Sequence, residues 1–410
     1  MKRSGTADLP LHNGYVPRWL AERMGRLGFA ITEALLCEYG KDEVLRRLGD
    51  PFWFQSLGAV MGMDWHSSGI TTSVMGALKR AINPHSREFG IYICGGKGKF
   101  SRQAPDEIRR VCETTGLDGD ALVRSSRLSA KVDNTAIQDG FQLYLHCFVL
   151  SDQGQWTVIQ QGMSDSSSMA RRYHWHSAGL RSFVEDPHTA ICGVNQGEIL
   201  NLADRQAGAA RRGVLSLSEE KPETMMQEIQ RLVLPSHHDV RTEDVDLRRL
   251  GAVLWLAHDR RPADFEELLL LEGVGPRTLQ SLALVSEVIY GAPARFRDPA
   301  RFAFAHGGKD GHPFPVPVKV YDETIGFLQT AVQKARVGQS DKLDALQKLG
   351  ELARKAEQDF IPAGGLEDYI EKERTDSWKY GGRTVTGEAM PPAGNGVAPR
   401  RATPRQMRLF

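Results

Sequence analysis

Hydrophobic residues recur at helical spacing in the first part of the chain, and the pattern changes to that of a strand near residue 89. Residues 89–94, FGIYIC, form an unbroken apolar run that predicts a buried strand. Two later runs, FQLYLHCFVL and QWTVIQQGM, flank turn residues at 151–154 and predict a β-hairpin. The helices predicted in this part cover residues 17–37, 42–48, the segment from Pro51, the segment ending at Ile82, 105–113 and 120–139.

Between about residue 222 and residue 360 the spacing is helical, except for an irregular segment over residues 292–320 that is rich in Gly, Pro and aromatic residues. The predicted helices here cover residues 225–234, 246–258, 264–271, 276–290, 321–334 and 342–360. The last segment is rich in Gly, Pro and Ala, so we expect it to be disordered. The fold expected is a mixed α/β (α+β) domain with a small sheet over residues 1–215, an all-α domain over 216–375 and a disordered tail over 376–410.

The turn EGVGPRT separates the predicted helices 264–271 and 276–290. Gly273 is expected to take a positive φ that ends the first helix, and Pro276 fits the first turn of the second. The free N–H groups of that turn lie beside the positive end of the helix dipole and favour a phosphate oxygen. The expected phosphate-binding residues are Gly273, Val274, Gly275, Pro276, Arg277 and Thr278. The alternative is a helical corner of a soluble core with a glycine cap.

The segment 264–291 resembles the helix-hairpin-helix motif of DNA repair and recombination proteins. The resemblance rests on the GVG turn, the flanking apolar helices and the small Ala283 where the two helices would cross. In that family the hairpin holds the DNA backbone without reading sequence. The resemblance therefore implies DNA as the partner.

A second glycine-rich segment follows the predicted strand 89–94 and precedes a predicted helix. A strand, a glycine loop with lysines and a helix start together favour a phosphate cradle, although the frame of a P-loop is absent. The alternative is a flexible surface turn. Together with the arginine pair near residue 171, this segment gives the further DNA-binding candidates Lys97, Lys99, Arg102, Arg171 and Arg172.

Polar residues interrupt otherwise apolar elements between residues 124 and 176. A divalent-metal nuclease needs two or three acidic ligands, so Mg²⁺ or Mn²⁺ is the candidate cofactor. The acidic frame usual for such a site is missing, because the strand ends in Gln-Gln-Gly. An acid/base pair in MDWHSSG and the polar cluster give the candidate catalytic residues Asp64, His66, Lys131, Asp133, Asp139 and Gln160. The alternative is a solvated helix face beside a hairpin.

The composition limits where nucleic acid can bind. The 410 residues carry a formal net charge of only +1, so a DNA site must be a local patch. Five scattered cysteines favour a reducing cytoplasm. The N-terminus lacks the apolar run of a signal peptide, and no apolar stretch approaches the length of a membrane span. We therefore expect a cytoplasmic protein without a membrane partner.

The last five residues, QMRLF, resemble the Gln-x-x-Leu-Phe peptide by which bacterial replication and repair proteins bind the β sliding clamp. The position at the end of an expected disordered tail makes such a peptide accessible. The resemblance implies the clamp as a second partner. The alternative is a C-terminus without such a role. The residues that would bind the clamp are Gln406, Met407, Leu409 and Phe410.

The blocks GTADLPLHNG, MGMDWHSSGITTSV, CGGKGKFSR, SAKVDNTAIQDG, ARRYHW and FAHGGKDGHPFPV resemble the prokaryotic domain-of-unknown-function family numbered 763. The resemblance covers roughly residues 5 to 335. Members of this family carry a helix-hairpin-helix near the C-terminus, so the resemblance implies the architecture and little chemistry.

These features favour a DNA-binding protein of DNA repair or replication that is tethered to the sliding clamp. The leading hypothesis is an enzyme that acts on DNA as a nuclease. One alternative is a non-enzymatic DNA-binding adaptor. A DNA glycosylase is the second alternative, although the sequence before Asp298 lacks the apolar residues that the glycosylases place ahead of their catalytic Asp.

Overall fold

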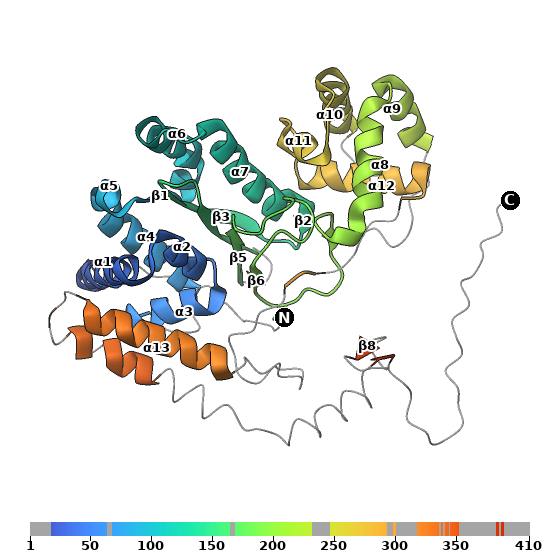
Figure 1. Cartoon of the computed structure of the whole chain (residues 1–410). Coiled ribbons are helices and arrows are strands. Elements are labelled where there is room, and N and C mark those ends of the chain that lie inside the picture. Colours follow the sequence, from blue (N-terminus) through green and yellow to red (C-terminus); the bar gives the residue numbers. More distant parts are fainter. Residues whose placement is uncertain are drawn as a thin grey trace, which may run out of the picture. The chain divides into compact units, whose positions relative to one another are not determined.

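The structure is a computed structural model (Figure 1). It describes residues 18–63, 68–164, 169–231, 247–292, 298–300, 318–335, 338, 341–343, 345–351, 383–384 and 387–388. The chain forms two compact units, Met1–Ala356 and Glu357–Phe410. In the second unit, β8 (Arg383–Thr384) pairs with β9 (Gly387–Glu388) in antiparallel fashion.

Several residues singled out from the sequence lie outside the described residues. They are Asp64, His66, Gln406, Met407, Leu409 and Phe410.

Four helices near the N-terminus form one layer of the first unit. They are α1 (Arg18–Tyr39), α2 (Lys41–Leu48), α3 (Pro51–Val60) and α4 (Gly69–Ile82). The start of α3 at Pro51 is as predicted, and the carboxylate of Asp50 caps it by accepting a 2.8 Å hydrogen bond from the amide N–H of Trp53. The short η1 (Asn83–His85) and α5 (Ser86–Phe89) lead into the sheet.

A five-stranded antiparallel sheet forms the centre of the unit, with strand order β1-β3-β4-β5-β6. Its strands are β1 (Ile91–Lys97), β3 (Gln142–Ser151), β4 (Trp156–Met163), β5 (Ala170–His176) and β6 (Ala190–Cys192). The three strands predicted from apolar runs are present. One row of paired residues crosses the sheet at the C-terminal end of β1. It consists of Lys97, Leu145, Gln161, Arg172 and Cys192.

The segment between β1 and β3 is less regular than the sequence predicts. It contains η2 (Gly98–Gln103), α6 (Ala104–Thr115), α7 (Gly119–Lys131), the π-helical turn η3 (Val132–Ala136) and β2 (Ile137–Gln138). The single helix predicted over 120–139 is wrong at its C-terminal end. Ile137 and Gln138 instead pair with β7 (Leu200–Asn201), and the widened turn before them directs Asp133 into the interior.

Helices are the only regular elements in the described residues between 208 and 292. They are α8 (Gly208–Glu219), preceded by η4 (Arg205–Ala207), then α9 (Pro222–Arg231), α10 (Leu247–Arg260), α11 (Phe265–Leu270) and α12 (Pro276–Tyr290). A further helix, α13, spans Val318–Lys334, and the described residues of 341–351 are also helical. Whether residues 216–375 form a separate all-α domain stays a prediction.

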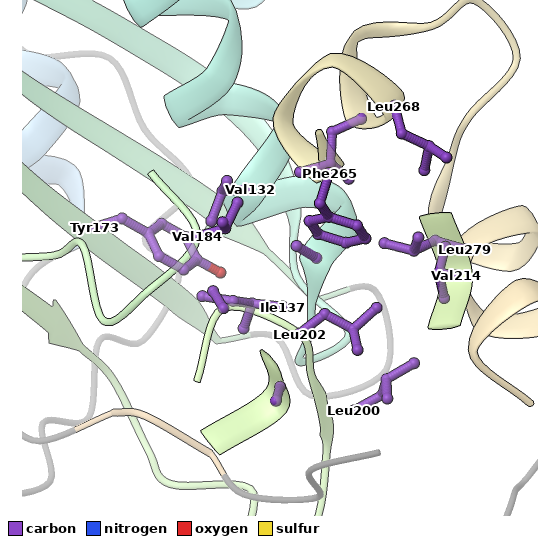
Figure 2. Packing of buried hydrophobic residues seen from close by; sticks show 14 of the residues in the cluster. Val132, Ile137, Tyr173, Val184, Leu200, Leu202, Val214, Phe265, Leu268 and Leu279 are labelled. Carbon is purple, nitrogen blue, oxygen red and sulfur yellow. The ribbon is translucent and has the colours of Figure 1, made fainter. Parts of the chain in front are cut away.

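Two hydrophobic clusters cover the two faces of the sheet. One joins the sheet to α1–α4 and α13, where Phe327 packs 4.5 Å from Tyr39 between ring centroids. The other joins the opposite face to α6, α7, η3 and the helices α8–α12. Figure 2 shows Phe265 of α11 and Leu279 of α12 gathered with Val132 of η3. The hairpin helices therefore share a core with the sheet. No helix among the described residues is both long enough and apolar enough to span a bilayer.

Candidate functional site

The turn between α11 and α12, residues 271–275, and the first three residues of α12, 276–278, are together called the hairpin turn. Gly273 has a φ of +82°, which is the left-handed conformation expected from the sequence. Gly275 is extended and caps α12, and Pro276 occupies the first turn of that helix. The amide of Leu279 donates a 2.9 Å hydrogen bond to the carbonyl of Gly275. Val274 is buried against the core, so the turn is anchored from inside.

The outer side of the hairpin turn is open to solvent. Gly273, Pro276 and Arg277 are exposed, and so is the acidic Glu272 beside them. Pro276 has no N–H, and helix geometry leaves the next amides without an intrahelical acceptor. Thr278 is buried instead, and its hydroxyl donates a 3.4 Å hydrogen bond to the carbonyl of Gly273. The hydroxyl therefore braces the turn and does not face solvent.

Two side chains from the N-terminal region hold the inner side of the hairpin turn. Lys131, at the end of α7, donates a 2.6 Å hydrogen bond from Nζ to the carbonyl oxygen of Val274. Gln138 in β2 donates from Nε2 to the carbonyl oxygen of Pro276 at 2.8 Å. Burial lowers the pKa of Lys131 below its usual value. Lys131, a candidate catalytic residue from the sequence, thus positions the hairpin turn.

A buried chain of hydrogen bonds crosses the sheet face on the same side as α7. Asp133 accepts a 2.6 Å hydrogen bond from Nε2 of Gln160 and contacts Nε2 of His188 at 2.5 Å. Nδ1 of His146 lies 2.9 Å from Oε1 of Gln160, and its Nε2 lies 2.8 Å from Oγ of Ser126. Burial raises the pKa of Asp133, and the neighbouring His188 opposes that shift. The structure thus brings Asp133 and Gln160 together in a sealed interior.

A second buried cluster surrounds Arg171. Its guanidinium donates to Asp139 at 2.8 Å and to both carboxylate oxygens of Asp298 at 3.0 and 2.6 Å. The hydroxyl of Tyr173 donates to Asp139 at 2.7 Å. Burial raises the pKa of Asp139, and the charge of Arg171 opposes the rise. Arg171 and Asp139 are therefore partners inside the protein.

Arg172 lies on the opposite face of β5 and is also fully buried. Its Nη2 donates to Oε1 of Gln55 at 2.8 Å, and its Nε donates to Nε2 of His174 at 2.9 Å. Both faces of β5 are covered, so neither of the two adjacent arginines reaches the surface. This location corrects the expectation that Arg171 and Arg172 contact DNA, because both side chains are buried.

The four described candidates for catalysis do not form one open site. Asp133 and Asp139 are buried and fully engaged in the bonds above, Gln160 belongs to the chain of Asp133, and Lys131 holds the hairpin turn. Within the described ranges, no three His, Cys, Asp or Glu side chains converge as a metal site.

The second glycine-rich segment, residues 97–102, is called the lysine turn. Lys97, Lys99 and Arg102 are all exposed. Sequence reasoning missed a fourth residue there, Phe100, whose side chain is 48% exposed. Its position between basic residues in KGKFSR was the available signal.

The lysine turn is fixed at its base by the peptide groups of Gly95. The carboxylate of Glu107 accepts a 2.7 Å hydrogen bond from the amide of Gly95, and Lys79 donates to the carbonyl of Gly95 at 2.6 Å. Gly95 has a φ of +86°, and a Cβ there would overlap the carbonyl oxygen of His146. The base of the lysine turn is therefore held in place by contacts with the rest of the fold.

One protein-family model matches most of the chain. The family model described as "Protein of unknown function (DUF763)" matches residues 5–316, and the chain belongs to this family. No curated protein and no solved structure matches the chain.

Proposed function

We propose that this protein binds the sugar–phosphate backbone of DNA through the outer side of the hairpin turn. The observation that carries the proposal is the exposure of Gly273, Pro276 and Arg277 at the N-terminal end of α12. Free amides and the positive end of the helix dipole attract a phosphate oxygen there, and the guanidinium of Arg277 adds a charge. The resemblance of the segment 264–291 to helix-hairpin-helix motifs supports the same partner.

The attachment of the hairpin turn supports this proposal. Lys131 and Gln138 bond to carbonyl groups of the turn and leave the first amides of α12 unbound by either side chain. Because the turn is already ordered, DNA binding does not have to offset the entropy of ordering it. A backbone contact of this kind carries no sequence information. We therefore expect binding that is independent of DNA sequence.

The buried acids weigh against a nuclease that uses Asp133 and Asp139. A metal-dependent nuclease needs carboxylates that a metal and a phosphate can both reach, and these two are 0% and 6% exposed. Asp298, the acid that follows the hairpin, is 4% exposed and bound to Arg171, which weighs against a glycosylase. The burial of these acids favours a DNA-binding adaptor over either enzyme, with Asp64 and His66 as the remaining pair for nuclease chemistry.

The role in repair or replication and the tether to the sliding clamp through Gln406, Met407, Leu409 and Phe410 belong to the same proposal. They rest on the resemblance of the C-terminal QMRLF peptide. Removing Leu409 and Phe410 is expected to abolish clamp binding and to leave DNA binding unchanged.

The substitution Gly275→Asp tests the proposed phosphate contact, because it places a negative charge at the cap of α12. Gly275 is extended, a conformation that any residue adopts, so Gly275→Ala is the matched control. Fluorescence anisotropy with several duplexes is expected to show a similar loss for every sequence in the Asp variant and near wild-type affinity in the Ala variant. Wild-type affinity should fall as salt rises. Equal binding by a folded Asp variant would overturn the proposal.

A further inference from the structure

The lysine turn presents an exposed aromatic ring among exposed cations. Phe100 is 48% exposed, and Nζ of Lys99 lies 5.4 Å from the centre of its ring. Nζ of Lys97 lies 5.8 Å from the ring centre of Tyr144 on the adjacent strand. A single exposed aromatic residue is ordinary by itself. The surrounding charge is what distinguishes this one.

The positive charge of the lysine turn is not neutralised within the part of the chain that the structure describes. Lys97, Lys99 and Arg102 form no ion pair there, whereas the acids that follow are paired. Glu107 binds Lys79 at 2.7 Å, and Asp106 lies 3.9 Å from Arg109. The turn is therefore complementary to an anion that also offers an aromatic or apolar surface.

The position of Phe100 is set by the backbone beneath it. A Cβ added at Gly96 would lie 3.2 Å from Cβ of Phe100, so the ring-bearing residue packs closely over that glycine. Oγ of Ser101 donates a 2.6 Å hydrogen bond to the carbonyl of Gly98. With Gly95 held by Glu107 and Lys79, the ring is presented by a fixed turn. Fixed aromatic platforms lose little entropy on binding.

We propose that the lysine turn binds single-stranded DNA, with an unpaired base stacked on Phe100 and the flanking phosphates near Lys97, Lys99 and Arg102. Single-strand binding sites combine a cationic track with aromatic rings, because every base offers a π-face. The base faces of an intact duplex are already stacked on one another. The turn therefore selects a strand end, a gap or a tail.

The lysine turn and the hairpin turn attach to the same end of the sheet. Lys97 pairs with Leu145 near the start of β3. Close by, the amide of Leu143 donates to Oδ1 of Asn134 in η3. Gln138, which follows η3 in the chain, donates a hydrogen bond to the hairpin turn. If the hairpin turn holds duplex, as proposed above, the substrate class is a junction between duplex and single strand. This step rests on the proposed function, whereas the stacking on Phe100 does not.

The test compares three DNA ligands with wild-type protein, Phe100→Ala and Phe100→Trp, with fold checked by thermal melting. The ligands are a blunt duplex, a single-stranded oligonucleotide and a duplex with a single-stranded tail. Phe100→Ala is expected to lose about tenfold in affinity for the two ligands with unpaired bases and to bind the blunt duplex as wild type does. Phe100→Trp should retain affinity, and the single strand should quench the fluorescence of the introduced indole ring.

Three results would overturn the proposal. Phe100→Ala that binds single strands as tightly as wild type would show that no base stacks on the ring. An equal loss on the blunt duplex would assign Phe100 to duplex binding. Phe100-dependent binding to anionic vesicles without binding to single strands would assign the lysine turn to a membrane surface. Failure of the hairpin proposal gives a different pattern, because Gly275→Asp would then leave blunt-duplex binding unchanged.

Discussion

The ammonium group of Lys131 lies 2.6 Å from the carbonyl oxygen of Val274, so the end of α7 holds the turn that joins α11 to α12. The two residues are separated by 143 positions in the sequence. Val274 is itself buried. The orientation of the proposed DNA-binding turn therefore depends on the N-terminal region as well as on its own helices.

Replacing this lysine tests that dependence. Lys131→Met keeps much of the side-chain volume and removes the hydrogen bond to Val274, which leaves a half-buried carbonyl without its donor. We expect the free energy of unfolding to fall by about 1–3 kcal/mol and DNA affinity to fall several-fold. Denaturant titration and fluorescence anisotropy measure the two effects.

Arg87→Met is the matched control for the loss of one positive charge. Arg87 is exposed on α5, which leads into the end of β1 remote from Lys97. The Arg87→Met variant should have nearly the same stability and DNA affinity as the wild-type protein. If the two variants lose DNA affinity equally, Lys131 acts only through its charge and the positioning role is wrong.

Replacing Arg171 is predicted to lower the stability of the protein, and this prediction concerns stability alone. Arg171→Met leaves Asp139 and Asp298 buried without their cation, and removal of one partner from a buried ion pair costs roughly 3–5 kcal/mol. Arg124→Met breaks the partly exposed 2.9 Å pair with Glu266 and should cost about 1 kcal/mol or less. Thermal unfolding compares them. A melting temperature for Arg171→Met close to that of Arg124→Met would contradict the buried cluster.

The buried His146 predicts a dependence of stability on pH. Burial lowers its pKa to about 4, with the hydrogen bond to Gln160 opposing the shift, whereas an unfolded histidine has a pKa of 6.5. The unfolded chain therefore binds the proton first as pH falls. The stability due to neutral His146 is complete above pH 6.5 and is lost toward pH 4, by roughly 3 kcal/mol.

A variant isolates this contribution from those of other groups. Burial also lowers the pKa of His174 and His176, which adds a change of the same sign. The raised pKa of Asp133 and Asp139 acts in the opposite direction at acid pH. His146→Gln should be less stable at pH 7 and should lose less stability between pH 6.5 and 4. Parallel curves for the variant and wild type would show that His146 does not carry the effect.

The sequence predicts the local features of this fold well and the long-range ones poorly. Gly273 and Pro276 act through their own backbone preferences, so the shape of the hairpin turn follows from local sequence. Gln160 was singled out because it interrupts an apolar strand, and it does meet Asp133. That the two lie in a sealed interior depends on the π-helical turn η3 and on the distant His188. No local pattern contains that information.

The burial of the arginine pair in β5 is a second feature that local sequence does not predict. Adjacent arginines favour a surface location on composition alone. Both are buried because helices cover both faces of the sheet, and their partners Gln55 and Asp298 lie more than a hundred residues away in sequence. A single helix over residues 120–139 would place Lys131 and Gln138 on one face, but α7 ends at Lys131 and Gln138 lies in β2. The two residues nevertheless converge, because both bond to the hairpin turn.

Hydrogen exchange of backbone amides with and without duplex DNA tests the central claim most directly, because it reports on the turn itself. The first amides of α12 have no intrahelical acceptor, so they should exchange rapidly in the free protein. Bound duplex is expected to slow exchange in peptides that cover residues 273–279 and to leave residues 83–90 unchanged. Saturating duplex that binds the protein without slowing exchange at residues 273–279 would contradict the account.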